Sequence, residues 1–291
     1  MDINYELYKV FYHVANTLSF SEASKQLFIS QSAVSQSIKV LEKKLNQPLF
    51  IRSTKRVQLT PEGEILLKHI EPAMNLIRQG ENQLLEANTL NGGQLRIGAS
   101  DTICRYYLVP FLREFHKNYP NVHIKVTNQT SINCVKLLES GQVDFAITNY
   151  PNSGLSNAQN VRIIHEFNDV FVANREYEEL KDREVSLNEL QKYPILMLDR
   201  RSTTSEFLHS MFQQHQLDLV PEIELSSNDL LVDLARIGLG IAFLPNYSVP
   251  QNDKELFTVH LKEKLPSRQL AVLHNENLPL SQAAKQFMEM L

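Results

Sequence analysis

The chain has 291 residues, of which 43% are hydrophobic and 21% charged, the size and composition of a folded protein with more than one domain. No apolar run could span a bilayer, and the N-terminus lacks the basic flank and apolar core of an export signal, so we expect a cytoplasmic protein that does not bind membranes. The net charge of −4 conceals a basic segment, because residues 1–60 carry eight Lys or Arg against four acids. A basic head on an acidic body favours contact with nucleic-acid phosphates at one end.

The first 45 residues predict three short helices around a shared core. Apolar residues recur at helical spacing through residues 5–17, and residues 19–45 contain two further helices that meet at a tight turn. Ser30 stands at the N-cap position of the second of these, where its hydroxyl can accept an otherwise unpaired amide. Two helices joined in this way have the layout of a DNA-reading helix-turn-helix.

The outward face of that second helix carries hydrogen-bonding side chains. Val34, Ile38 and Leu41 fall on one face and must pack inward, which leaves polar residues outside. Gln pairs bidentately with adenine in the major groove, Ser bonds base edges or phosphates, and Lys adds charge for the DNA backbone. The alternative interpretation is an ordinary solvated helix face. The candidate DNA contacts are Ser30, Gln31, Ser32, Ser35, Gln36 and Lys39.

A hairpin is expected next, because residues 49–52 and 56–59 are two short strand-like stretches around a basic turn. A wing of this kind places its charged tip against a phosphate or in the minor groove. Arg52, Lys55 and Arg56 are therefore further candidate DNA contacts, with a solvated turn as the alternative.

A long helix is predicted from Pro61 to about residue 88. Thr60 supplies the N-cap, and proline is well tolerated at the first helical position, where its missing amide has no helical partner. Such a helix cannot bury a long apolar seam against a small head, so we expect it to pair with a second copy, while Pro72 predicts a kink. The seam follows the alternating steps of four and three of a coiled coil: Leu66, Ile70, Ala73, Ile77, Gly80, Leu84 and Ala87.

From residue 94 strands alternate with helices, which predicts two α/β lobes, each a parallel sheet covered by helices, with a ligand cleft between them. The predicted strands are 95–99, 122–127, 143–148, 169–173, 194–198, 222–225, 241–244 and 269–273, with helices ending near residues 118 and 140 and others at 202–214, 228–236 and 279–290. The expected organisation is a winged helix-turn-helix over 1–60, a linker helix over 61–90 and an effector-binding domain over 91–291, whose lobe I covers about 91–165 plus 266–291 and lobe II about 166–265.

Candidate ligand contacts lie where these strands end and helices begin. Hydroxyls and amides at helix starts favour an anion, and Arg200 or Arg201 could supply a counter-charge. The alternative is that the same Ser and Thr residues act only as N-caps. The candidate effector contacts are Ser100, Thr102, Thr130, Ser131, Thr148, Arg201, Ser202 and Thr203.

Several of these segments together resemble LysR-type transcriptional regulators. The resemblance covers essentially the whole chain. It rests on residues 20–45, 48–52 and 59–63 in the head, and on residues 95–100, Phe115, Tyr119, Pro120, 141–147 and 238–245 in the body. Ser24, Ser32 and Asn46 depart mildly from the usual pattern, which has Ala, Pro and Gly there. The resemblance implies a winged helix-turn-helix, a dimerising linker helix and a periplasmic-binding-protein-like domain that senses a small molecule, usually in a homotetramer. A member that activates transcription would also contact RNA polymerase.

Other chemistries find little support. Cys104 and Cys134 lie in predicted helices among apolar neighbours, which favours core packing over a redox switch. The nine His lack metal-ligand spacing, so no metal or other cofactor is expected. Residues 98–102 lack the second glycine of a nucleophile elbow, and there is no phosphate-binding loop. We therefore predict a ligand-responsive transcription regulator and not an enzyme, with a ligand-independent, DNA-binding architectural protein as the alternative.

Overall fold

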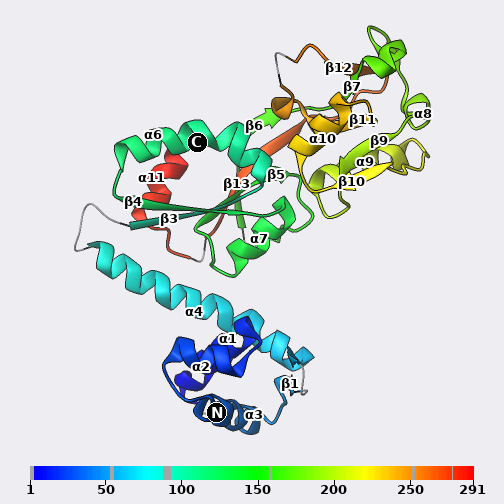
Figure 1. Cartoon of the computed structure of the whole chain (residues 1–291). Helices are drawn as coiled ribbons and strands as arrows, with labels where there is room; N and C mark the ends of the chain where they lie inside the picture. Colours follow the sequence, from blue (N-terminus) through cyan, green and yellow to red (C-terminus); the bar gives the residue numbers. More distant parts are fainter. Residues whose placement is uncertain (1–2, 53–55, 88–92, 157–158, 251–252, 277) are drawn as a thin grey trace. The chain divides into compact units, whose positions relative to one another are not determined.

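The computed structural model describes residues 3–52, 56–87, 93–156, 159–250, 253–276 and 278–291 (Figure 1). The chain divides into two compact units. One unit comprises Met1–Asn88 with Ser140–Gln142, and the other comprises Thr89–Glu139 with Val143–Leu291.

Three helices with a common core form the head. They are α1 (Tyr5–Thr17), α2 (Phe20–Leu27) and α3 (Gln31–Leu45). Phe11, Ala23 and Ile38 are fully buried where the three helices meet, since each helix turns its apolar side inward. The Ser30 hydroxyl accepts the Ala33 amide at 3.2 Å, so the predicted N-cap and the helix-turn-helix are confirmed.

The wing follows directly as an antiparallel pair, β1 (Phe50–Arg52) and β2 (Val57–Leu59), with Phe50 opposite Leu59. Phe50 anchors this hairpin to the head, because its ring lies 5.5 Å from the ring of Phe11 and 6.0 Å from that of Phe20. The predicted hairpin is therefore confirmed, although the turn at residues 53–55 lies outside the described part of the chain.

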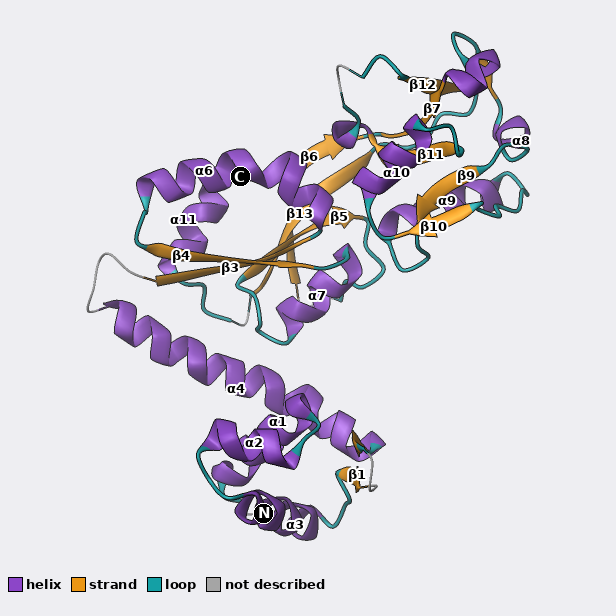
Figure 2. Cartoon of the chain, in the orientation of Figure 1, coloured by secondary structure: helices purple, strands orange, loops and turns teal. Residues whose placement is uncertain are grey.

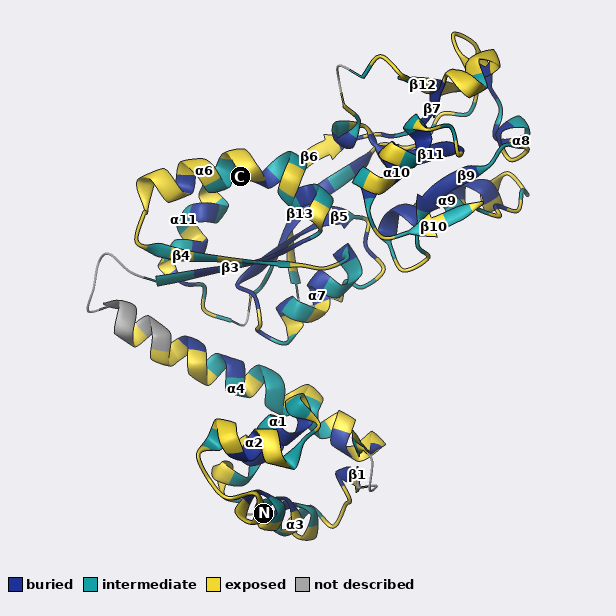
Figure 3. Cartoon of the chain, in the orientation of Figure 1, coloured by how far each residue is buried: buried dark blue, intermediate teal, exposed yellow. Residues whose placement is uncertain are grey.

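The linker helix α4 (Pro61–Ala87) is capped by Thr60, whose hydroxyl accepts the Gly63 amide at 3.0 Å. It is continuous through Pro72, so this proline does not end the helix. The predicted seam has two parts: Leu66 and Ile70 pack against the core of the head, whereas farther along Ile77 is 58% and Leu84 72% exposed. Figure 3 shows that exposed positions recur along α4. The second part of the seam therefore presents apolar side chains that the head does not cover.

The first lobe of the other unit is built on a five-stranded sheet in the order β4-β3-β5-β13-β6 (Figure 2). Its strands are β3 (Gly93–Ala99), β4 (Val122–Asn128), β5 (Phe145–Tyr150), β6 (Gln159–Phe167) and β13 (Arg268–Asn275). The expectation of a wholly parallel sheet is wrong here, because β13 runs antiparallel to both β5 and β6. β6 was not predicted at all; it is an edge strand, and most of its residues are exposed.

Helices cover both faces of this sheet. They are α5 (Asp101–Ile103), a π-helical turn (Cys104–Leu108), α6 (Val109–Asn118), α7 (Ser131–Glu139) and α11 (Gln282–Met290). Phe115 of α6 and Phe287 of α11 share one core with Phe145, while Cys134 of α7 shares the other with Ala146. Successive residues of β5 thus point to opposite faces, as the period of a strand requires.

The second lobe has a six-stranded sheet in the order β10-β9-β11-β7-β12-β8. Its strands are β7 (Asp169–Asn174), β8 (Glu184–Val185), β9 (Ile195–Leu198), β10 (Ile223–Leu225), β11 (Ile241–Pro245) and β12 (Leu256–Leu261). Its helices are α8 (Leu187–Leu190), α9 (Thr203–Gln214) and α10 (Asn228–Arg236), with 3-10 turns at Arg175–Leu180 and Asn246–Ser248. This sheet too is mixed, because β7 is antiparallel to β11 and β12. β8, β12 and α8 were not predicted from the sequence.

Two chain segments connect the lobes. β6 ends at Phe167 and β7 begins at Asp169, and β12 ends at Leu261 before β13 begins at Arg268. An ion pair joins these two connecting segments. Arg268 Nη1 lies 2.8 Å from Asp169 Oδ2, and both side chains are almost completely buried. The two lobes are thus held together by a buried charge pair as well as by the backbone.

The two cysteines are free thiols that differ in burial. Cys134 is fully buried in the core beneath α7, which confirms its predicted packing role, whereas Cys104 is half-buried and donates to Asn128 Oδ1 at 3.3 Å. Burial raises the pKa of both thiols to about 12, helped at Cys104 by the nearby Asp101 carboxylate.

We expect both cysteines of the native chain to resist iodoacetamide at pH 8, because a shift of this size lowers the reactive thiolate fraction by about a thousandfold. Mass spectrometry after timed alkylation measures this, with the chain unfolded in urea as the control in which both thiols react. Rapid modification of either thiol in the native chain would contradict the shielding and reopen a redox role.

Candidate functional site

The candidate DNA-contacting residues of α3 lie on one face of this helix. Gln31, Ser32, Gln36 and Lys39 are exposed and Ser35 is half-buried, while Val34, Ile38 and Leu41 on the opposite face are fully buried. The predicted division of the helix into an inward apolar face and an outward polar face is therefore confirmed. The outward face presents carboxamides, hydroxyls and one amine, the groups that read base edges and phosphates in a major groove.

Ser30 differs from the other candidates on this helix. Its hydroxyl accepts the Ala33 amide and lies 2.9 Å from the Ser32 hydroxyl, so it already has a structural role. In the wing, Arg56 is exposed and Arg52 lies in β1, whereas Lys55 lies outside the described residues. The structure therefore places the candidates on α3 on one surface, with Arg56 in the wing that follows.

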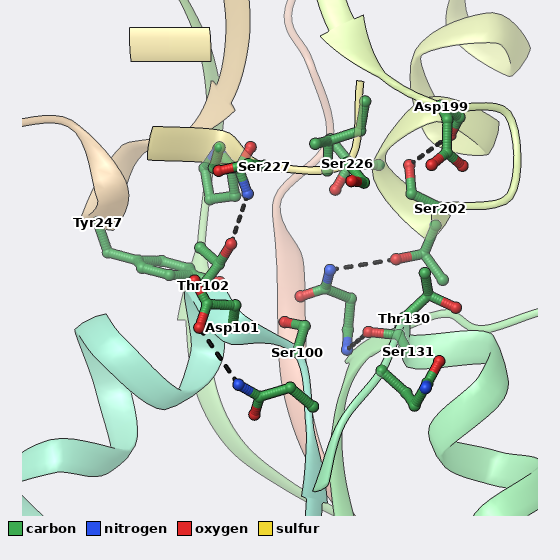
Figure 4. A pocket seen from close by; sticks show the side chains of 18 residues that line it. Ser100, Asp101, Thr102, Thr130, Ser131, Asp199, Ser202, Ser226, Ser227 and Tyr247 are labelled. Carbon is green, nitrogen blue, oxygen red and sulfur yellow. Dashed lines mark hydrogen bonds between the residues drawn. The ribbon is translucent and has the colours of Figure 1, made fainter. Parts of the chain in front are cut away.

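A cavity of about 350 Å³ lies between the two lobes of the second unit (Figure 4). Polar side chains from both lobes line it, in agreement with a cleft beyond the strand ends of two α/β sheets. Six of the eight predicted effector contacts are among the lining residues: Ser100, Thr102, Thr130, Ser131, Ser202 and Thr203.

Four helices begin at this cavity. The hydroxyls of Ser100, Thr130, Ser202 and Ser227 cap α5, α7, α9 and α10, accepting backbone amides at 3.4, 3.3, 3.1 and 3.3 Å. These residues therefore act as N-caps and also line the cavity, so the two interpretations of them do not exclude each other. Helix amino ends carry partial positive charge, so four of them directed at one space favour an anionic group there.

Two predicted contacts, Thr148 and Arg201, do not line the cavity, and these are corrections. Thr148 is fully buried within β5. Arg201 is exposed, and its backbone amide donates to Asp199 Oδ1 at 2.9 Å, which turns the chain into α9. No Lys, Arg or His is found among the lining residues that the structure describes, and Asp101 and Asp199 belong to them. Arg200 and Arg201 therefore do not supply the expected counter-charge at this cavity.

Several lining residues were not predicted, and two of them bridge the lobes. Asn149 Nδ2 donates to Thr203 Oγ1 at 3.1 Å, and Asn228 Nδ2 donates to Thr102 Oγ1 at 2.7 Å. Ser227 could have been found in the sequence, because it precedes a predicted helix just as Ser202 does. The cross-lobe pairs could not, since their members lie 54 and 126 residues apart. The other unpredicted lining residues are Asp101, Asn128, Gln129, Leu198, Asp199, Thr204, Ser226, Pro245 and Tyr247.

A helix-turn-helix head combined with a two-lobed α/β domain around a polar cavity defines a class of protein: a DNA-binding regulator with its own ligand-binding domain. Two family models match the chain, the LysR substrate binding domain over residues 88–291 and the bacterial regulatory helix-turn-helix protein of the lysR family over residues 5–64. The chain therefore belongs to the LysR family of transcriptional regulators and is not an enzyme.

Its relatives agree with this assignment. The transcriptional activator CmpR of Synechocystis sp. is 28% identical over 83% of this chain and 79% of its own length. The transcriptional regulator YofA of Bacillus velezensis is 27% identical over 96% of this chain and 94% of its own. Among solved structures, a full-length OxyR variant from Pseudomonas aeruginosa covers 99% of this chain and 94% of its own with a TM-score of 0.74 at 18% identity. CbnR in complex with its target DNA covers 99% and 98% with a TM-score of 0.68 at 16% identity.

Two negative findings apply to the described residues. None of their helices combines the length and the apolar character that crossing a membrane would require. Nor do they contain a group of three or more His, Cys, Asp and Glu side chains that could hold a metal ion.

Proposed function

We propose that this regulator binds a small effector in the interlobe cavity and that binding changes its action at promoter DNA. In this division of labour, residues 1–60 read double-stranded DNA, residues 61–90 pair two chains, and residues 91–291 sense the effector. The observation that carries the proposal is the cavity of about 350 Å³, a volume suited to a small metabolite and lined by hydroxyls and amides from both lobes.

We propose further that the effector has an anionic group. The four helix starts favour a negative charge, because the first amides of a helix have no carbonyl partner within the helix. Asp101 and Asp199 in the lining would repel a second negative group, so a ligand with one anionic group and hydrogen-bond donors elsewhere suits the cavity best.

The DNA contacts of the head are proposed on its surface chemistry. Gln31 and Gln36 are exposed on the same side of α3 and are proposed to read base edges. Ser32, Ser35 and Lys39 are proposed to contact bases or phosphates, with Arg52, Lys55 and Arg56 of the wing contributing charge. Two heads in one assembly would read a pseudo-palindrome with half-sites spaced by whole helical turns.

Self-association is proposed to occur through α4. Ala73, Ile77, Gly80 and Leu84 continue the coiled-coil seam beyond the head and are exposed, so a second copy of the helix would bury them. A tetramer made of two such dimers, and contact with RNA polymerase if the protein activates transcription, are proposals carried over from the family alone.

A thermal-shift screen of the full chain tests the sensing function. Small carboxylates and oxyanions are screened for a saturable rise in melting temperature, because a ligand at 100 times its Kd adds about 2.7 kcal/mol to the free energy of unfolding. The variant Ser226→Phe fills the cavity from an exposed lining position and should abolish the rise. Ser210→Phe, on an exposed α9 position outside the lining, is the matched control. Absence of any hit would favour the ligand-independent architectural alternative.

A further inference from the structure

A set of interlobe contacts lies just outside the cavity, on residues that do not line it. Arg105 and Tyr106 belong to the π-helical turn of the first lobe, and Asp229 belongs to α10 of the second. Arg105 Nη1 donates to Asp229 Oδ2 at 2.9 Å, and the Tyr106 hydroxyl donates to Asp229 Oδ1 at 2.5 Å. One carboxylate of the second lobe is thus held through both of its oxygens by two donors of the first.

Each of these three side chains contacts the other two. The guanidinium of Arg105 also lies over the ring of Tyr106, 5.4 Å from its centroid. Burial raises the pKa of Tyr106 to about 12, and its hydrogen bond to Asp229 adds to the shift, so the phenol remains a donor at any working pH.

The position of these contacts connects them with the cavity. Asp229 follows Asn228, whose Nδ2 donates across the cavity to Thr102 Oγ1, and Thr102 lies one turn before Arg105 and Tyr106. Arg105, Tyr106 and Asp229 thus hold together the two elements that carry this cross-cavity pair. A π-helical turn at this place is notable, because such turns are rare and concentrate at functional sites.

We propose that Arg105, Tyr106 and Asp229 form an interlobe clasp that holds the effector cavity closed and sets how readily a ligand enters and leaves. They are positioning residues, since they act on the cavity through Thr102 and Asn228. The proposal rests on the proposed sensing function but can be tested without a ligand, because opening of the clasp exposes the backbone of both lobes to solvent.

Hydrogen exchange of the full chain, followed by mass spectrometry, tests the clasp. In Asp229→Asn, amide exchange in residues 100–106 and in residues 226–229 should quicken by about tenfold, because a charge-assisted pair is lost from the closed state only. Tyr106→Phe should act in the same direction. The effect of the double variant should be smaller than the sum of the two single effects, since both changes weaken hydrogen bonds to the same side chain, that of residue 229. Arg183→Ala is the matched control, because it removes an exposed ion pair with Glu189 that lies within one lobe.

Amide exchange in residues 100–106 of the first lobe distinguishes the clasp from a merely local structural role of Asp229 in α10. Asp229 lies in the first turn of α10, so its loss could fray that helix by itself. Faster exchange confined to residues 226–236, or additive effects of Asp229→Asn and Tyr106→Phe, would overturn the clasp. A ligand that stabilises the wild type and Asp229→Asn equally would also count against the clasp while leaving the sensing function intact. If the wild type binds no ligand but the exchange pattern is as expected, the result would support the clasp and contradict the sensing function.

Discussion

Replacing Arg268 by methionine is expected to lower the free energy of unfolding of the two-lobed unit by about 3–5 kcal/mol, because it leaves a buried carboxylate without its partner. The Arg268 guanidinium is 2% exposed and donates to Asp169 Oδ2 at 2.8 Å and to the hydroxyls of Thr204 and Thr203 at 3.2 and 3.3 Å. Its remaining surroundings include the rings of Phe207 and Phe167, whose centroids lie 5.1 and 5.3 Å from the guanidinium carbon.

The pH dependence of this variant follows from the same geometry. Burial raises the pKa of Asp169, and Arg268 opposes that rise in the wild type. Without Arg268 the folded-state pKa of Asp169 rises still further above its unfolded value, so the deficit should be largest at neutral pH and shrink as the pH falls and the carboxyl takes up a proton.

Urea unfolding followed by circular dichroism measures the loss, since the chain contains no tryptophan. The double variant Asp169→Asn with Arg268→Met should recover much of it, because no charge then remains buried. Arg183→Ala, which removes an exposed ion pair, is the control and should change little. A single variant as stable as the wild type would show that the pair does not hold the two connecting segments together.

Gln31→Ala and Gln36→Ala are each expected to weaken binding to the specific DNA site by about 1–3 kcal/mol, the value of a bidentate carboxamide–base pair. The site is first obtained by selecting bound sequences from a random duplex pool with the wild-type chain. Affinity for a scrambled duplex should hardly change, because phosphate contacts dominate there. Fluorescence anisotropy on both duplexes measures the difference.

Arg52→Ala supplies the contrasting variant. It should weaken binding to the selected and the scrambled duplex alike and reduce the dependence of affinity on salt concentration, since a phosphate contact releases counterions from any sequence. Equal losses on both duplexes for the two glutamine variants would remove the base-reading assignment and leave α3 as a phosphate-binding helix.

Strong local signals were sufficient to predict the head and much of the body. Ser30 and Thr60 cap their helices as expected, and residues 228–236 form the helix that their pattern predicts. β6 escaped prediction because an edge strand with mostly exposed residues shows no apolar alternation. The antiparallel direction of β13 could not be inferred, because hydrophobic pattern indicates that a strand is buried and not which way it runs.

The candidate site also contains residues that could be predicted from the sequence and residues that could not. Residues that begin helices could be found, because a capping hydroxyl has a sequence signature whether or not it also faces a ligand. Pairs that depend on tertiary contact could not: Arg105 with Asp229 and Arg268 with Asp169 are 124 and 99 residues apart. Arg201 was predicted as a ligand contact from its place after a strand, but the turn into α9 directs that position to the surface.

A small molecule bound in the cavity is proposed to change DNA binding by the head. The most direct measurement is the affinity of the full chain for its selected duplex by fluorescence anisotropy, with and without a saturating amount of the ligand identified by thermal shift. We predict a change in affinity of at least about fivefold, the usual lower range of coupling between two sites on one protein. An unchanged affinity, although the ligand is shown to be bound, would contradict ligand-responsive regulation. Equal affinity for the scrambled and the selected duplex would contradict sequence-specific DNA binding.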